Sequence, residues 1–379
     1  MKRALLTLLT TLILLVFPPI QAIAQDSSPV EPDSGAVVCP PGVYITNPGD
    51  CLPLGPSAYL TGLAQLGMTF PLRPLPASKP DPSLTQLPYR YFHLEPGEFV
   101  PIYSTPGEKG PGVQQFSPGF VYIVYVDQAN VNGVYYLLQS GGWIPGKGER
   151  VGEIPAFQGL IFQNTPRNSF GWAFEQIPVV SAPGYSAPAT AQQIYPFQTM
   201  YIYAVQIADN TDWYLIGPDQ WVEGRKVARV IPNTTSPQGV DTNRWIDVDL
   251  AEQTLVVYDN NRLVFATVIA SGQEPFWTRP GTFQIYQKKE VETMRNNDPS
   301  DFYYLDNVPW TMYFDGPRAL HGAYWRTRFG YSQSHGCVNL SVGDANWLFQ
   351  WAHEGDWVYI HDPSGLTPTD PALYIGGAY

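Results

Sequence analysis

The stretch SHGCVNLSVGDANWLFQW, residues 334–351, decides the fold of the last third of the chain. Gly336 permits a tight backbone turn immediately before Cys337, and such a turn can aim consecutive N–H groups at one point. Ser341 and Asp344 then have the spacing of a helix-capping box, with Asp in place of Glu. The apolar residues that follow recur on one helical face. We therefore expect a turn that carries a cysteine, followed directly by a short helix.

Two histidines lie near Cys337 in sequence, His335 beside it and His321 in the pair His321-Gly322. A thiol becomes a good nucleophile when a nearby imidazole or clustered N–H groups lower its pKa. A buried, inert cysteine and a zinc site formed by His321, His335 and Cys337 are the alternatives. A papain-like peptidase is disfavoured because it places its cysteine before its histidine, the reverse of the order here.

The composition of the whole chain favours a mainly β protein. Of 379 residues, 38 are Pro, 34 are Gly and 14% are aromatic, so aromatic and β-branched runs alternate with turns. The formal net charge of −12 argues against nucleic acid and against an anionic membrane surface as partners. A chain of this length has room for two or three domains.

Residues 1–24 are typical of a secretory signal peptide. Lys2 and Arg3 precede an apolar run over residues 4–17 that is too short to span a bilayer comfortably, and Ala22-Ile23-Ala24 fits a cleavage site. An uncleaved anchor helix is the alternative. We expect export to the periplasm, the cell envelope or the extracellular space, with no stable membrane span after cleavage.

Export changes the interpretation of the three cysteines. Residues 25–90 are expected to form an N-terminal leader, in which Cys39 and Cys51 bracket a loop rich in Pro and Gly. In an oxidising compartment a disulfide between these two is plausible, and two unpaired thiols are the alternative. Cys337 is then left unpaired, which calls for a chemical explanation.

An internal repeat divides the next part of the chain into residues 91–150 and 151–231. Segments 101–107, 135–137 and 143–144 recur as 178–184, 213–215 and 221–222, an offset of 77 or 78 residues, and 121–123 corresponds to 200–202. Each copy alternates apolar strands with turns, as in a small barrel. The pattern resembles bacterial SH3-like domains, which implies two small β-barrels that bind or space the cell wall. Two structural barrels without a ligand are the alternative.

The rest of the chain is expected to comprise a linker at residues 232–243, a last domain at residues 244–362 and a tail at residues 363–379. The linker is polar and contains Pro and Gly. The last domain begins with alternating apolar strands and a hairpin signal.

Several motifs of the last domain together resemble the L,D-transpeptidase (YkuD-type) family, whose signature is a His, a spacer and Ser/Thr-His-Gly-Cys. They are His321-Gly322, Ser334-His335-Gly336-Cys337, the turn Thr278–Phe283 and the segment Val308–Phe314. The resemblance covers about a third of the chain. It implies a β-sandwich with a short helix, in which the cysteine loop covers the site.

The resemblance also implies a role for each residue of the signature. Cys337 is the acylated nucleophile, and His321 is its base, with its ring oriented by the Gly322 carbonyl. The N–H groups of Gly336 and Cys337 form an oxyanion hole. The residues that shape the pocket are Ser334 and His335.

The family cleaves the bond between the third, L-centred diamino acid and D-alanine of a peptidoglycan tetrapeptide stem. It passes the acyl group to an amine of a second stem, to a protein amine or to water. We expect carbapenem-type β-lactams to be covalent inhibitors, and we expect no cofactor and no metal. An L,D-carboxypeptidase that uses water and a non-catalytic cell-wall-binding protein are the alternatives.

Candidate substrate-binding residues are less well defined by the sequence. They are Tyr313, Tyr324 and Asn339, and Asn339 stands where many members of the family carry Arg. Trp325 and Arg326 are further candidates. Aromatic packing accounts equally well for the tyrosines and the tryptophan.

Overall fold

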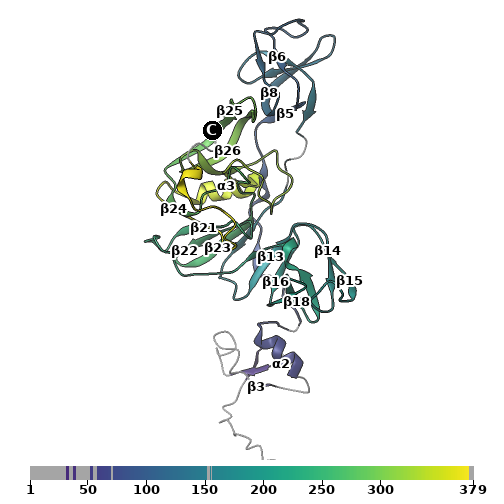
Figure 1. Cartoon of the computed structure of the whole chain (residues 1–379), viewed down its shortest axis with the longest axis vertical. Coiled ribbons are helices and arrows are strands. Elements are labelled where there is room, and N and C mark those ends of the chain that lie inside the picture. The colour runs from purple at the N-terminus through teal and green to yellow at the C-terminus, as the bar shows by residue number, and fades with distance from the viewer. Residues whose placement is uncertain are drawn as a thin grey trace, which may run out of the picture. The chain divides into compact units, whose positions relative to one another are not determined.

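The computed structural model describes residues 31–33, 37–39, 52–53, 58–69, 71–151, 154 and 156–374 (Figure 1). The chain divides into two compact units, residues 1–65 and 66–379. In the first unit, strands β1 (Glu31–Asp33), β2 (Val37–Cys39) and β3 (Leu52–Pro53) form an antiparallel sheet, and helix α2 spans Ala58–Gln65. The predicted signal peptide and the side chains of the predicted Cys39–Cys51 disulfide lie outside the described residues.

The second unit consists mainly of β-strands, as the composition predicts. Its strands up to residue 150 are β4 (Ala77–Ser78), β5 (Arg90–Leu94), β6 (Val100–Ile102), β7 (Gln114–Phe116), β8 (Phe120–Asn130), β9 (Val134–Leu138), β10 (Trp143–Pro145) and β11 (Gly148–Arg150). Then follow β12 (Leu160–Phe162), β13 (Ser169–Ala173), β14 (Ile177–Val180), β15 (Ala189–Ile194), β16 (Thr199–Ile202), β17 (Ala204–Ala208), β18 (Thr211–Gly217), β19 (Gln220–Glu223) and β20 (Val227–Val230).

The C-terminal strands and helices complete this unit. The strands are β21 (Trp245–Asp249), β22 (Thr254–Asp259), β23 (Arg262–Val268), β24 (Gly281–Gln284), β25 (Gln287–Asn296), β26 (Tyr303–Asp315), β27 (Arg318–Gly322), β28 (Val338–Leu340) and β29 (Trp357–His361). The helices are α3 (Val342–Trp351) and the short 3₁₀ turns η2 (Pro82–Thr85), η3 (Gly224–Lys226) and η4 (Pro371–Tyr374). Among the described helices, none has both the length and the apolar character needed to cross a bilayer.

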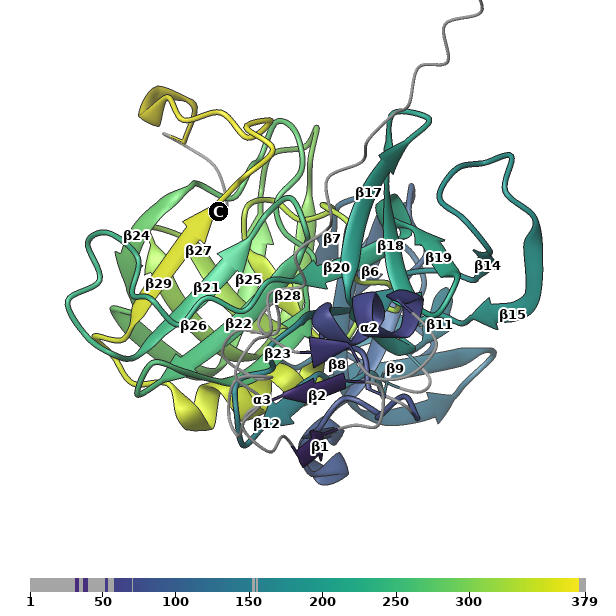
Figure 2. The same cartoon turned by 90° about the horizontal axis from the view of Figure 1, so that it is seen from below.

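Two sheets of the C-terminal part share one hydrophobic core (Figure 2). One sheet has the strand order β24-β29-β21-β22-β23-β12-β4, and the other contains β25, β26, β27 and β28. Their common core includes Val257 of β22, Leu320 of β27, Leu340 of β28 and Leu348 of α3. The expected layout of sheets with a short helix is therefore present.

Helix α3 begins where the capping signal predicts, but its acidic residue has a different partner. The Ser341 hydroxyl accepts the Asp344 N–H at 3.3 Å, which is half of a capping box. The Asp344 carboxylate is fully buried and instead accepts the Gly159 N–H at 2.8 Å and the Thr267 hydroxyl at 2.5 Å. Asp344 thus ties α3 to a segment 185 residues earlier in the chain.

The sequence repeat is also a repeat of strand pairing. Equivalent residues are cross-strand partners in the two copies: Tyr136–Ile144 and Tyr103–Trp143 in the first, Tyr214–Val222 and Val180–Trp221 in the second. These pairings confirm a duplicated unit. That the unit is an SH3-like barrel stays a prediction.

Strands from outside the predicted last domain extend both of its sheets. Strand β8, from the first repeat copy, pairs in parallel with β26, with Phe120 opposite Tyr303 (Figure 1). On the other sheet, β12 pairs with β23, and β4 of the predicted leader pairs with β12. Strand pairing therefore crosses the predicted domain limits.

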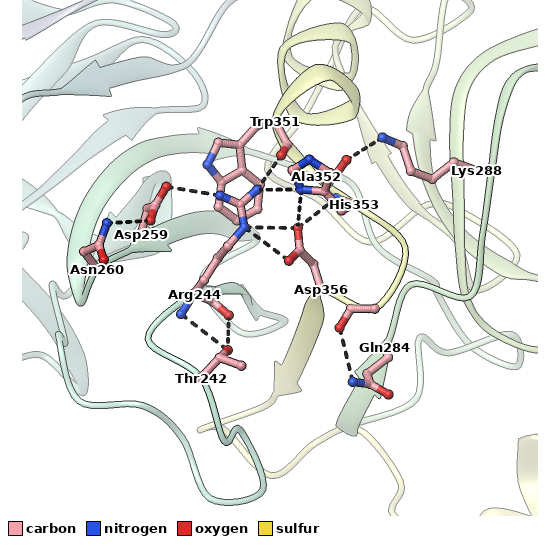
Figure 3. A network of polar contacts seen from close by, with 11 residues as sticks. Thr242, Arg244, Asp259, Asn260, Gln284, Lys288, Trp351, Ala352, His353 and Asp356 are labelled. Atoms are coloured by element: carbon pink, nitrogen blue, oxygen red, sulfur yellow. Dashed lines mark hydrogen bonds and ion pairs between the residues drawn. The ribbon is translucent and has the colours of Figure 1, made fainter.

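Arg244 joins three elements where the last domain begins (Figure 3). Its Nε donates to both carboxylate oxygens of Asp356 at 3.1 and 3.2 Å, and its Nη1 donates to Asp259 at 3.1 Å. Its Nη2 donates to the Trp351 carbonyl at the end of α3. One guanidinium thus connects the start of β21, the end of β22 and the segment between α3 and β29.

Candidate active site

His321 and Cys337 lie in and directly before two adjacent parallel strands. His321 lies in β27, and Cys337 immediately precedes β28. In the register of this pair, His321 lies opposite Asn339. The three residues line one cavity of about 330 Å³. The pairing of β27 with β28 therefore closes the loop between the histidine and the cysteine.

The turn before Cys337 is fixed by hydrogen bonds on both sides. Gly336 has φ = 107°, a left-handed conformation that favours glycine. Its carbonyl accepts the Thr278 hydroxyl at 2.9 Å, and its N–H donates to Ser334 Oγ at 3.2 Å. Ser334 Oγ donates in turn to the Cys337 carbonyl at 2.5 Å. Since Thr278 opens the motif Thr278–Phe283, that motif supports the cysteine turn.

Burial holds Cys337 in its thiol form in the resting site. Its residue surface is 9% exposed, and burial raises the pKa of Cys337 to about 11. A hydrogen bond from the Ala319 N–H and the charge of Arg318 lower the pKa but do not outweigh burial. For Cys337 to act as a nucleophile, its thiol proton would therefore have to be removed during the attack.

His321 is neutral for the same reason. Burial lowers the pKa of His321 to about 4; the Gly322 carbonyl acts to raise it, and the charge of Arg326 lowers it further. Its Nδ1 lies 3.1 Å from the Gly322 carbonyl oxygen, the contact implied by the family resemblance. Its Nε2 lies 3.0 Å from Asn339 Nδ2. A neutral imidazole with one acceptor nitrogen can take the proton of a thiol.

Two of the predicted supporting groups have partners of their own. The Gly336 N–H, expected in the oxyanion hole, donates to Ser334 Oγ, so this donor is engaged within the turn. His335 Nε2 lies 3.1 Å from Asp301 Oδ1, and its ring packs near those of Phe276 and Tyr303. His335 thus lines the wall of the cavity, with its Nε2 paired to Asp301.

The three candidate substrate-binding residues are placed differently from one another. Asn339 lines the cavity of His321, and Tyr313 lines a second cavity, of about 410 Å³, that also reaches Cys337. Tyr324 lines neither cavity, so its prediction as a substrate-binding residue is corrected. It is 1% exposed, stacks on Tyr91 with 3.6 Å between ring centres, and donates to the Asp306 carbonyl at 2.7 Å.

The structure adds cavity residues that the sequence does not indicate. Phe120, from the first repeat copy, lines the cavity of His321 and Cys337. Glu292 lines the second cavity, where Tyr313 Oη donates to it at 3.4 Å. No motif marks Phe120, because only the pairing of β8 with β26 brings it to the site.

No group of three or more His, Cys, Asp and Glu side chains in the described part of the chain is placed to hold a metal ion. Of the three residues considered for a zinc site, His335 is paired with Asp301, and His321 has both ring nitrogens in contact with other groups.

A family model described as the L,D-transpeptidase catalytic domain, YkuD, matches residues 243–360. A point mutant of the Enterococcus faecium L,D-transpeptidase is 25% identical, with a TM-score of 0.30, over 31% of this chain and 49% of that chain. The Stackebrandtia nassauensis L,D-transpeptidase is 27% identical, with a TM-score of 0.29, over 35% of this chain and 60% of that chain.

The catalytic domain of the E. faecium enzyme, solved as its ertapenem-acylated form, is 27% identical with a TM-score of 0.29, over 31% of this chain and 96% of that domain. A search among curated proteins finds no similar sequence. The match spans about half of the first of these structures and three fifths of the second. Residues 243–360 thus match the model of the L,D-transpeptidase catalytic domain, the family that the sequence motifs resemble.

Proposed function

We propose that this chain is an exported cysteine L,D-transpeptidase that acts on the tetrapeptide stems of peptidoglycan. The observation that carries the proposal is the position of His321 and Cys337 on one cavity, within the segment that matches the catalytic domain. The supporting sequence feature for export is residues 1–24, which have the composition of a signal peptide.

The proposed reaction begins with two neutral groups. Cys337 Sγ attacks the carbonyl carbon of the third, L-centred residue while its proton passes to His321 Nε2. The tetrahedral intermediate collapses, the bond to D-alanine breaks, and the D-alanine amine leaves with the proton from Nε2. A thioester to Cys337 remains. An acceptor amine then attacks it, and the thiol recovers its proton.

Two cavities at Cys337 favour an amine acceptor over water. The cavity of His321 and the cavity of Tyr313 both include Cys337, Met294 and Tyr303 in their walls. An acyl-enzyme formed from one side thus leaves space on the other for a second substrate.

Acylation by a carbapenem tests the nucleophile. Intact-mass measurement after incubation with ertapenem, which acylates the E. faecium catalytic domain, is expected to show one adduct on the wild type and none on Cys337→Ala. His321→Ala is expected to slow adduct formation by roughly 10²–10⁴-fold, the usual loss when a proton-transfer residue is removed. Equal labelling of wild type and Cys337→Ala would contradict the proposal.

Product analysis separates the proposed reaction from the alternatives. With purified disaccharide tetrapeptide, the transpeptidase is expected to release D-alanine and to form 3-3 cross-linked dimers. Release of D-alanine with tripeptide as the product would instead show an L,D-carboxypeptidase. Binding to purified sacculi without either product would show a wall-binding protein. Mass measurement of the exported protein's N-terminus checks cleavage after Ala24.

A further inference from the structure

Arg326 forms the centre of a small network between the two catalytic residues of the proposed reaction. It lies in the loop that joins His321 to Ser334 and lines their cavity. Its Nε donates to Asn339 Oδ1 at 2.5 Å. Its Nη1 and Nη2 donate to the side-chain and backbone oxygens of Gln333 at 3.0 and 2.8 Å. Gln333 thus holds the guanidinium while Nε points at Asn339.

The contact between Arg326 and Asn339 settles which way the Asn339 amide points. A guanidinium only donates hydrogen bonds, so the amide atom that faces Nε must be the oxygen. The NH₂ group of Asn339 then faces His321 Nε2, at 3.0 Å. Because that group is a donor, Nε2 must be the acceptor, and the ring proton lies on Nδ1, 3.1 Å from the Gly322 carbonyl oxygen.

We infer that Arg326 is a positioning residue, which fixes the proton-accepting tautomer of His321 by orienting the side-chain amide of Asn339. The inference deepens the proposed function, and its catalytic consequence rests on that function. Arg326 acts through Asn339 and not on the substrate bond, so its loss is expected to change the protonation pattern of His321 as well as the rate.

The charge environment of Arg326 agrees with this role. Within the described part of the chain, no carboxylate lies at ion-pair distance from its guanidinium, and its hydrogen-bond partners are the neutral groups of Asn339 and Gln333. A partly buried guanidinium without a carboxylate is costly for stability alone. Its donors are instead directed at one amide oxygen and at the loop that ends in the cysteine turn.

The same network also affects how His321 gives up the proton that it takes from the thiol. Nε2 has one lone pair, so its bond with Asn339 must open when Nε2 takes the thiol proton. The protonated Nε2 then faces the Asn339 NH₂ group, donor against donor. This repulsion favours passing the proton on to the departing amine.

Nitrogen NMR of histidine-labelled protein tests the inference without any substrate. In the wild type, the His321 signals, assigned by their loss in His321→Gln, are expected to show a protonated Nδ1 and a bare Nε2 between pH 6 and 8. Arg326→Gln is expected to add a population with the proton on Nε2. It should also lower the rate of ertapenem acylation by roughly 10–100-fold, a part of the general-base contribution.

Two further variants sharpen the test. Arg326→Lys keeps one N–H donor for Asn339 and is expected to restore much of the wild-type pattern and rate. Asn339→Asp places an acceptor opposite Nε2, so the proton should move onto Nε2 and acylation should fall as far as in His321→Ala. Arg328→Gln, an exposed arginine of the same loop, is the matched control and should behave as the wild type.

The inference is overturned if Arg326→Gln keeps the wild-type tautomer pattern, or if its acylation rate stays within twofold of the wild type. If Arg326→Gln fails to fold, the NMR spectrum of Asn339→Asp is used in its place. An unprotonated His321 Nε2 in Asn339→Asp would then overturn the inference. Failure of the wild type to form any adduct would count against the proposed function, whereas the tautomer pattern would still test Arg326.

Discussion

The guanidinium carbon of Arg244 lies 3.4 Å from the centre of the Trp351 ring, so the charged plane covers the aromatic face (Figure 3). The same guanidinium is bonded to Asp356 and Asp259, and the Arg244 side chain is only 23% exposed. A cation held between an aromatic ring and two carboxylates contributes strongly to local stability. Its partners lose both charge pairing and packing when it is removed.

Arg244→Met is therefore expected to destabilise the protein by roughly 2–4 kcal/mol, since it leaves two carboxylates without their cation. Urea unfolding followed by tryptophan fluorescence measures the change. Arg150→Met, at an exposed arginine of the first repeat copy, is the control and should change stability by less than about 0.5 kcal/mol. Equal stability of the two variants would show that the network of Arg244 contributes little.

The reactivity of Cys337 toward a small alkylating reagent is expected to rise with pH without a plateau near neutrality. Because burial raises the pKa of Cys337 to about 11, the thiolate fraction grows about tenfold for each pH unit from 7 to 9. His321, whose pKa burial lowers to about 4, is neutral there and does not hold a thiolate as an ion pair.

Iodoacetamide labelling of the Cys337 peptide, quantified by mass spectrometry at each pH, checks this expectation. N-acetylcysteine, labelled under the same conditions at each pH, reports the pH dependence of the reagent with an ordinary thiol. A rate that is already constant between pH 5 and 8 would indicate a preformed thiolate–imidazolium pair instead.

Phe120→Ala is expected to lower kcat/KM for the stem peptide without changing the reactivity of the Cys337 thiol. Phe120 lines the active-site cavity from the first repeat copy, and losing its ring removes about 1–2 kcal/mol of apolar contact, or roughly 5–30-fold in kcat/KM. Iodoacetamide labelling of Cys337 should stay within twofold. Phe99→Ala, at a 58% exposed position in the same copy, serves as the control. A kcat/KM equal to that of the wild type in Phe120→Ala would show that the first repeat copy does not take part in substrate binding.

Asp344→Asn is expected to remove part of the pH dependence of folding. Burial raises the pKa of Asp344 to about 6, above its ordinary value of 3.8. Between these two values the unfolded chain loses this proton while the folded protein keeps it, so stability falls as pH rises from 4 to 6. The full effect of a two-unit shift is about 3 kcal/mol.

Urea unfolding at pH 4 and pH 7 measures this effect as a difference. The free energy of unfolding of Asp344→Asn, measured relative to that of the wild type, should be higher at pH 7 than at pH 4. The reason is that the amide stays neutral throughout this range. Protonation of His321 in the unfolded chain makes stability rise with pH over an overlapping pH range, opposite to the effect of Asp344. Because His321 is present in both proteins, the comparison with the wild type cancels its contribution. Asp219→Asn serves as the control, at an exposed turn with φ = 51° that Asn also accommodates. Its stability should show the same pH dependence as that of the wild type.

The motifs around the nucleophile could be predicted because their chemistry is local. A glycine before the cysteine, a serine cap after it and a histidine with its glycine carry their own backbone and hydrogen-bond requirements, and the structure meets most of them at Gly336, Ser341 and Gly322. The sequence leaves the role of Tyr324 open, because a tyrosine beside a site and a tyrosine in a core have the same sequence pattern. Only its stack on Tyr91, 233 residues earlier, distinguishes the two.

By itself, then, the sequence determined the mainly β class, the duplicated unit and the residue types of the cysteine turn, since strand alternation, repeat spacing and turn chemistry depend on near neighbours. The tertiary structure alone decided that Phe120 borders the cavity, that Asp344 holds Gly159, and that Arg326 reaches His321 through Asn339. These contacts depend on parallel strand pairings and on a loop closure, and their free energy comes from burial that no local pattern encodes.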